Sequence, residues 1–353
     1  MNQHRYMSTI VIGIARRNCC TLWALLASLL SATSYCAADV DLEPLKCDPA
    51  KVLGAESCAK CHENEVKTWK QTPHFRTFET LHRNPEAKAI TKRLGLSTVK
   101  RNDTCVKCHY TQQSKGERVR VVSGVSCESC HGAARYWSPL HNDYGGPNVT
   151  KDMESAEHRQ QRREASIAAG MNNPSNLYLV ARQCLSCHTT PEEQLVNVGG
   201  HKPGSQDFEL VAWSQGMVRH NFLRTGGTTN GTPSQAQLRV MYVVGVMADL
   251  EASLRATAKA TTKATFGTSS AQRAARLKQR LQKIQQLAAH PQIDLALAAA
   301  ISAPLKLGQQ DTLLSAAEAI GRAAFTFAQD ADGADLAALD SLLPPPSTYK
   351  QQE

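Results

Sequence analysis

The stretch that decides the fold is Cys105-Val-Lys-Cys108-His109, followed closely by Cys127-Glu-Ser-Cys130-His131. Two further copies of this Cys-x-x-Cys-His pattern flank it. The pattern is typical of haem c attachment, because two cysteines three apart lie on one face of a helical turn, where both sulfurs reach the vinyl groups of one porphyrin. The next residue, a histidine, brings its imidazole to the iron. The outer copies are Cys58-Ala-Lys-Cys61-His62 and Cys184-Leu-Ser-Cys187-His188. The sequence therefore predicts four covalently attached haems, with His62, His109, His131 and His188 as proximal ligands.

Zinc is the main alternative for these cysteines. Cys105, Cys108, Cys127 and Cys130 also fit the two-pair spacing of a zinc ribbon. A zinc site would give no reason for a histidine after every second cysteine, and it would leave the outer two copies unexplained. Haem is therefore the favoured interpretation, with eight of the 12 cysteines forming thioethers.

Length and charge bound the class of protein. A chain of 353 residues is long enough for two domains, and its formal net charge is +9. Loss of an N-terminal export segment would remove three arginines and no acid, and haem propionates would lower the charge further. No basic run is interleaved with aromatic residues, so nucleic acid is not an expected partner.

Residues 1–38 have the features of an export signal. Their apolar run, residues 19–30, is too short to span a bilayer comfortably, and small residues before Asp39 offer a cleavage site. We expect Sec-dependent export to the periplasm, an oxidising compartment, and no membrane span in the mature chain. The alternative is a membrane anchor formed by an uncleaved segment that also uses residues 10–14. Cys47 is left as an odd thiol with no assigned role.

The order of features predicts two structured parts after the signal. Residues 39–230 carry all four motifs and should form a multihaem cytochrome c domain of short helices with little sheet. Residues 231–343 contain no cysteine and predict an Ala-rich antiparallel helical bundle, which begins with a capping box of Ser234 and Gln237. The expected fold class is therefore mainly α. Scaffolding is the favoured role for the bundle, with capping of the haem domain or partner binding as alternatives. Residues 344–353 are expected to be a disordered tail.

The second axial ligand of each iron must come from outside the motifs. Only seven histidines stand outside the motifs and the signal: His74, His82, His141, His158, His201, His220 and His290. Among them His201 stands between glycines and a proline, a setting typical of a loop, which makes it a good ligand candidate. Met217, about one helical turn before His220, is a competing donor, and a Met ligand would raise the potential of its haem.

The order of these motifs resembles the cytochrome c-554 family of tetrahaem cytochromes c. The resemblance covers residues 54 to about 225. It rests on the four motifs, on Trp69-Lys-Gln-Thr-Pro-His74, and on Gly124-Val-x-Cys-Glu-Ser-Cys-His-Gly132 with His141. It implies parallel-stacked haem pairs in a mostly helical wrap, with His74, His141 and His220 as distal ligands of the fourth, first and third haems. In that family the second haem lacks a distal protein ligand, and here His201 could close that position.

Two functions are open at this stage. Largely bis-His haems would form a wire that carries electrons from one redox protein to another. An open second haem would instead suit an oxidoreductase of small nitrogen compounds such as nitric oxide, nitrite or hydroxylamine, for which no catalytic residues can be assigned. A third interpretation, haems as structural staples of a binding module, is the least favoured. An electron carrier is favoured over a catalyst.

Overall fold

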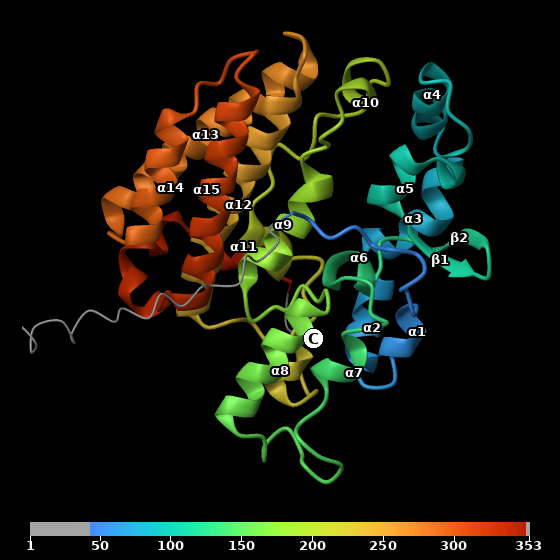
Figure 1. The fold of residues 1–353 in the computed structure, drawn as a ribbon, viewed down its shortest axis with the longest axis vertical. Helices are drawn as coiled ribbons and strands as arrows, with labels where there is room; N and C mark the ends of the chain where they lie inside the picture. The colour runs from blue at the N-terminus through green and yellow to red at the C-terminus, as the bar shows by residue number, and fades with distance from the viewer. Residues whose placement is uncertain (1–42, 351–353) are drawn as a thin grey trace, which may run out of the picture. The chain divides into compact units, whose positions relative to one another are not determined.

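Helices make up nearly all the regular structure of residues 43–350, the part of the chain that the computed structural model describes (Figure 1). The predicted mainly α class is confirmed. The predicted export signal lies outside the described residues. The helices that precede the bundle are α1 (Ala55–Cys58), α2 (Glu63–Lys70), α3 (Pro73–Thr80), α4 (Pro85–Arg93), α5 (Asp103–His109), α6 (Cys127–His131), α7 (Ser138–His141), α8 (Ala156–Ala168), α9 (Leu177–His188), α10 (Glu193–Asn197) and α11 (Leu210–Gln215), with 3-10 turns at Leu81–Arg83, Val99–Arg101 and Phe222–Thr225.

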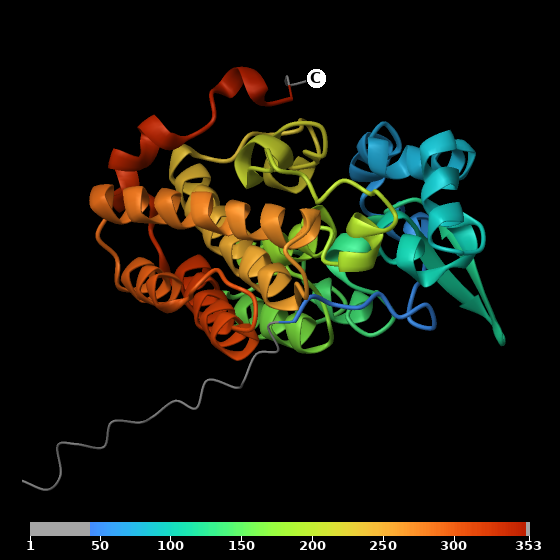
Figure 2. The same ribbon diagram turned by 90° about the horizontal axis from the view of Figure 1, so that it is seen from above.

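A single hairpin is the only sheet within residues 43–350. Strands β1 (Thr111–Lys115) and β2 (Arg118–Ser123) pair antiparallel, and Figure 2 shows the hairpin projecting away from the bundle. It turns the chain back between the second and third motifs. At its base the Thr111 hydroxyl donates to the Gly124 carbonyl over 2.8 Å, which closes the hairpin against the start of the third motif.

The C-terminal bundle is built around one central helix. Helix α12 (Gln235–Lys259) packs against α13 (Thr265–Leu287) and α15 (Gln310–Asp330), and α14 (Pro291–Ser302) packs on α15. The predicted capping box of α12 is present. The sequence predicts one apolar stripe on α12, but the helix is buried on nearly every side because neighbours surround it. The predicted bundle region ends in a 3-10 segment, Gly333–Leu342.

Helix α9 joins the haem motifs to the bundle. It carries the fourth motif at its C-terminal end and packs against both α12 and α15 (Figure 1). Tyr178, Leu179 and Leu185 on α9 are almost fully buried in the same apolar cluster as the bundle helices. This cluster therefore extends across residue 230, the expected domain boundary.

Residues 344–350, which the sequence predicts as part of a disordered tail, have a defined conformation in the structure. A 3-10 turn, Pro346–Thr348, is followed by Tyr349, which packs on the main apolar cluster. The Lys350 amide donates to the Gln215 carbonyl over 2.9 Å, and Arg219 donates to the Lys350 carbonyl. The aromatic side chain of Tyr349 and two hydrogen bonds of the Lys350 backbone thus order a proline-rich segment. Within residues 43–350, no helix has both the length and the apolar character needed to cross a bilayer.

Candidate haem-binding site

The motif histidines stand at helix ends. His109, His131 and His188 are the last residues of α5, α6 and α9, so their imidazoles project from the final turn. In the first motif α1 ends at Cys58, and His62 closes a turn by donating its amide to the Cys58 carbonyl over 2.9 Å. Side-chain capping sets where these helices start; on α5, for example, the Asn102 side chain accepts the Cys105 amide. Local capping thus helps to position His109, His131 and His188.

Each motif histidine faces one histidine from a distant part of the chain. The four ring pairs have nearly the same separation, although their interplanar angles range from 25° to 84°. The ring centres are 6.3 Å apart for His62 and His141, 6.2 Å for His109 and His201, 6.2 Å for His131 and His220, and 6.1 Å for His188 and His74. These are the combinations of haem and distal ligand that the family resemblance implies, together with His201 opposite the second motif.

The common separation fits a metal ion between each pair of rings. Two metal–imidazole bonds of about 2 Å each, with about 1 Å from each bonded nitrogen to its ring centre, give about 6 Å. Direct ring stacking or a hydrogen bond would not require four pairs to share one distance at four different angles. The donor set fits haem, because each pair lies beside the two cysteines of its own motif.

Hydrogen bonds at Nδ1 leave Nε2 available in several of these rings. The Nδ1 atoms of His131, His141, His201 and His220 lie 2.5–3.2 Å from the backbone carbonyls of Asn172, Ser138, Lys202 and Val218. A carbonyl only accepts, so Nδ1 carries the proton and Nε2 keeps its lone pair for a metal. The His188 Nδ1 lies 2.9 Å from the Ser205 hydroxyl.

Burial keeps three of the motif imidazoles neutral. Together with a smaller contribution from facing or neighbouring imidazoles, it lowers the pKa of His109, His131 and His188 to about 4. Burial also lowers the pKa of His74 and His141. Neutral imidazole is the form that binds metals, so these rings are ready ligands at ordinary pH.

The remaining candidates take other places. His158 hydrogen bonds to Glu154, and His290 caps α14 and packs edge-on against Phe327. His82 lies in the 3-10 turn after α3. Met217, the competing donor, is 63% exposed, and the His220 ring is the one that faces His131.

The cysteines that could have formed a zinc ribbon have other neighbours. Cys127 interacts with Cys58 of the first motif, and Cys108 interacts with Cys187 of the fourth. Nowhere in residues 43–350 do three or more His, Cys, Asp or Glu side chains gather as a bare metal ion would require. The cysteine contacts instead bring the first motif beside the third and the second beside the fourth.

The structure gives two residues of the third motif region a supporting role that the motif pattern alone does not reveal. The buried Glu128 carboxylate, inside the third motif, accepts amides of Leu53, Gly54 and Ala134 over 2.7–2.8 Å and so fastens the approach to the first motif. Gly124 is required because a Cβ there would lie 2.1 Å from the His74 carbonyl oxygen.

The loop that carries His201 is fastened in the same way. Arg93 of α4 donates from Nε and Nη2 to the Gly199 carbonyl over 2.8 and 2.5 Å. Gly200, with φ of 72°, adopts a backbone conformation that other residues rarely take. The contact between Arg93 and Gly199 does not follow from a motif, because it joins segments far apart in the chain.

Comparison with known proteins agrees with this site. The family described as cytochrome c554 and c-prime matches residues 57–132, which hold the first three motifs and His74. Cytochrome c-554 of Nitrosomonas europaea is 32% identical over 103 residues, 26% of this chain and 43% of the relative. Residues 57–132 are therefore similar to the cytochrome c-554 family. No solved structure matches the chain.

The match of residues 57–132 to the cytochrome c-554 family implies covalently attached haem c. The chain spans less than half the length of the relative that it matches. His141, His201 and His220 lie beyond the residues that the family matches, as does the fourth motif. Their assignment therefore depends on the ring geometry.

Proposed function

We propose that this protein is a periplasmic tetrahaem c-type cytochrome that carries electrons between two redox proteins. The observation that carries the proposal is the set of four histidine pairs, one per motif, all separated by 6.1–6.3 Å. Haem c, when bound, supplies the one-electron couple. The polypeptide attaches, orients and shields the groups.

The proposed ligand set has two parts. Cys58, Cys61, Cys105, Cys108, Cys127, Cys130, Cys184 and Cys187 would form the thioethers, and His62, His109, His131 and His188 would be the proximal ligands. The distal ligands would be His141, His201, His220 and His74 in the same order. Imidazole on both sides leaves no iron position free for a substrate, which favours electron transfer over catalysis.

The four positions are contiguous. Cysteine contacts join the first motif to the third and the second to the fourth. Burial raises the pKa of Cys130 of the third motif, and Cys184 of the fourth motif lies close enough to raise it further. Groups held at adjacent positions suit movement of charge from one side of the protein to the other. The expected partners are an electron donor and an electron acceptor, both redox proteins.

The alternative, reduction or oxidation of a small nitrogen compound at an open second haem, is not favoured. It depends on a second motif without a distal ligand, and the His201 ring lies 6.2 Å from that of His109. No other observation supports a substrate site at that position.

His201→Ala tests the proposal. If His201 is a distal ligand, the oxidised variant should show one new high-spin haem that binds cyanide or nitric oxide, while the wild type is low-spin throughout. His82→Ala is the control, since His82 lies in the 3-10 turn after α3 and its ring is not paired with that of a motif histidine. A His201→Ala spectrum identical to wild type, with high-spin haem already present in both, would overturn the six-coordinate assignment.

A further inference from the structure

One axial histidine is held directly by the bundle. Arg273 of α13 donates from Nη1 to the His188 carbonyl over 3.1 Å. The other edge of its guanidinium grips Asp249 of α12, with Nε and Nη2 at 2.7 and 2.9 Å from the two carboxylate oxygens. Ser253 also donates to this carboxylate. Arg273 therefore joins a bidentate ion pair between two bundle helices to the backbone carbonyl of the proposed haem ligand His188.

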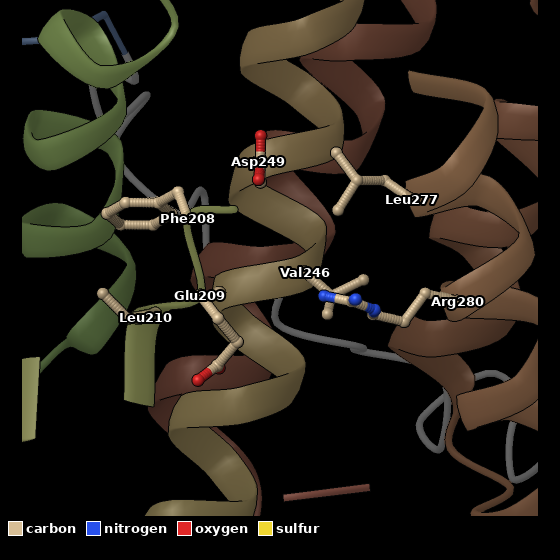
Figure 3. A pocket seen from close by; sticks show the side chains of 8 residues that line it. Phe208, Glu209, Leu210, Val246, Asp249, Leu277 and Arg280 are labelled. Carbon is tan, nitrogen blue, oxygen red and sulfur yellow. The ribbon is translucent and has the colours of Figure 1, made fainter. Parts of the chain in front are cut away.

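The ion pair is shielded from solvent. The side chains of Arg273 and Asp249 are only 4% and 5% exposed. Figure 3 shows Asp249 beside a small cavity between α12, α13 and the segment with Phe208 and Glu209. The cavity volume is about 10 Å³, room for at most about one water. Charges in such a place act on their neighbours with little screening.

The same device occurs a second time, at another haem position. Arg162 of α8 donates from Nη1 to the His141 carbonyl over 2.6 Å, and it grips the fully buried Glu154 carboxylate with Nε and Nη2 at 2.6 and 2.7 Å. In both cases the cation lies between the axial histidine and the carboxylate. Both arrangements, on different helices, join a buried carboxylate to the backbone of a proposed axial histidine.

We propose that Arg273 and Asp249 are positioning residues through which the C-terminal bundle sets the reduction potential of the fourth haem. The inference rests on the proposed function, since it requires His188 to be an iron ligand. It gives the bundle a redox role in place of scaffolding alone.

The direction in which each substitution shifts the reduction potential follows from the positions of Arg273 and Asp249 relative to His188. A cation beside the ligand favours the reduced iron, which carries one positive charge fewer than the oxidised iron. Asp249 offsets part of that effect from the far side of Arg273. Removal of the carboxylate should therefore raise the potential, and removal of the guanidinium should lower it.

The test is a redox titration of the intact holoprotein and of the variants Asp249→Asn, Arg273→Met and Arg273→Lys. Optical and electron paramagnetic resonance spectra monitor the oxidation state of the haems. One of the four one-electron steps should move, upward in Asp249→Asn and downward in Arg273→Met. We expect about a tenfold change in the reduction equilibrium constant, which is about 59 mV for one electron. Arg273→Lys, which keeps the charge, should shift the step less.

Arg239→Met is the matched control. Arg239 forms an equally bidentate pair with Asp340 in the same bundle, but the Arg239 guanidinium donates its remaining hydrogen bond to the Gly333 carbonyl. Its removal should leave all four steps in place. Shifts of the same sign in Asp249→Asn and Arg273→Met, or equal shifts in the control, would overturn the inference. A wild-type mass showing fewer than four haems would instead refute the proposed function.

Discussion

The haem-binding region and the C-terminal bundle are stabilised in different ways. The bundle buries one large cluster of leucine, isoleucine, valine and alanine side chains between long helices. The haem-binding region before α9 has short helices, a hairpin and only a small apolar cluster of Val99, Val106 and Tyr110. Its segments are joined by side-chain to backbone hydrogen bonds such as those of Glu128 and Arg93. A chain region built around cofactors needs less apolar core of its own, and it depends on them in return.

The largest effect should come from loss of haem attachment. In a chain whose eight motif cysteines are replaced by alanine, residues before α9 should lose protection from hydrogen exchange, because they bury too little apolar surface to offset the entropy of folding. Helices α12–α15 should keep their protection. Hydrogen exchange with mass spectrometry reads both regions in one sample. Full protection of the haem-binding region without haem would show that it has a sufficient core.

A cavity created by substitution in the bundle should destabilise the bundle and leave the haem-binding region unchanged. Leu281 is fully buried on α13, so Leu281→Ala should cost about 2–5 kcal/mol of unfolding free energy. The haem spectra should not change. Leu295→Ala is the control, because Leu295 is 59% exposed on α14 and its removal should cost about 0.5 kcal/mol or less. Denaturant titration monitored by circular dichroism measures the unfolding free energy of both variants. An altered haem spin state in Leu281→Ala would show that the bundle core and the haem-binding region are not stabilised independently.

A smaller effect is expected from Glu154. Hydrogen bonds from Arg162 and His158, set against burial, hold the pKa of Glu154 at about 2. A carboxylate with a depressed pKa stabilises the folded state above its unfolded pKa, about 4.3, and this contribution is lost as the pH falls toward 2.

Glu154→Gln should therefore lower the melting temperature at pH 7 by a few degrees. The difference from wild type should shrink below about pH 4. Glu157→Gln on the exposed face of α8 is the control and should match wild type throughout. A constant difference between Glu154→Gln and wild type from pH 7 to pH 2 would show that charge is not the cause. Thermal melts across this range supply the comparison.

Sequence reasoning goes furthest where chemistry is local. The spacing of Cys105, Cys108 and His109 predicts haem attachment without any structure, and the capping box predicts the start of α12. The resemblance to a family implies three of the distal ligands, His74, His141 and His220, whereas His201 is suggested by its loop setting. The ring pairs join residues as far apart as His74 and His188. No pattern in the sequence predicts such long-range pairs.

Other features depend on tertiary packing. Arg273 is one of many basic residues in a polar stretch of helix, and only the approach of α13 to α9 brings it to the His188 carbonyl. The order of the chain up to Lys350 also depends on distant segments, since Tyr349 packs on the main apolar cluster and the Lys350 amide donates to the Gln215 carbonyl. The nearly complete burial of α12 likewise follows from its central position among other helices.

The most direct test of the account is a spin-quantified electron paramagnetic resonance spectrum of the oxidised holoprotein, taken with an intact mass. The account predicts a mass equal to the mature polypeptide plus four haems, with all four irons low-spin and indifferent to added cyanide. A mass that matches bare polypeptide or polypeptide with zinc, or a high-spin haem that binds cyanide, would contradict it.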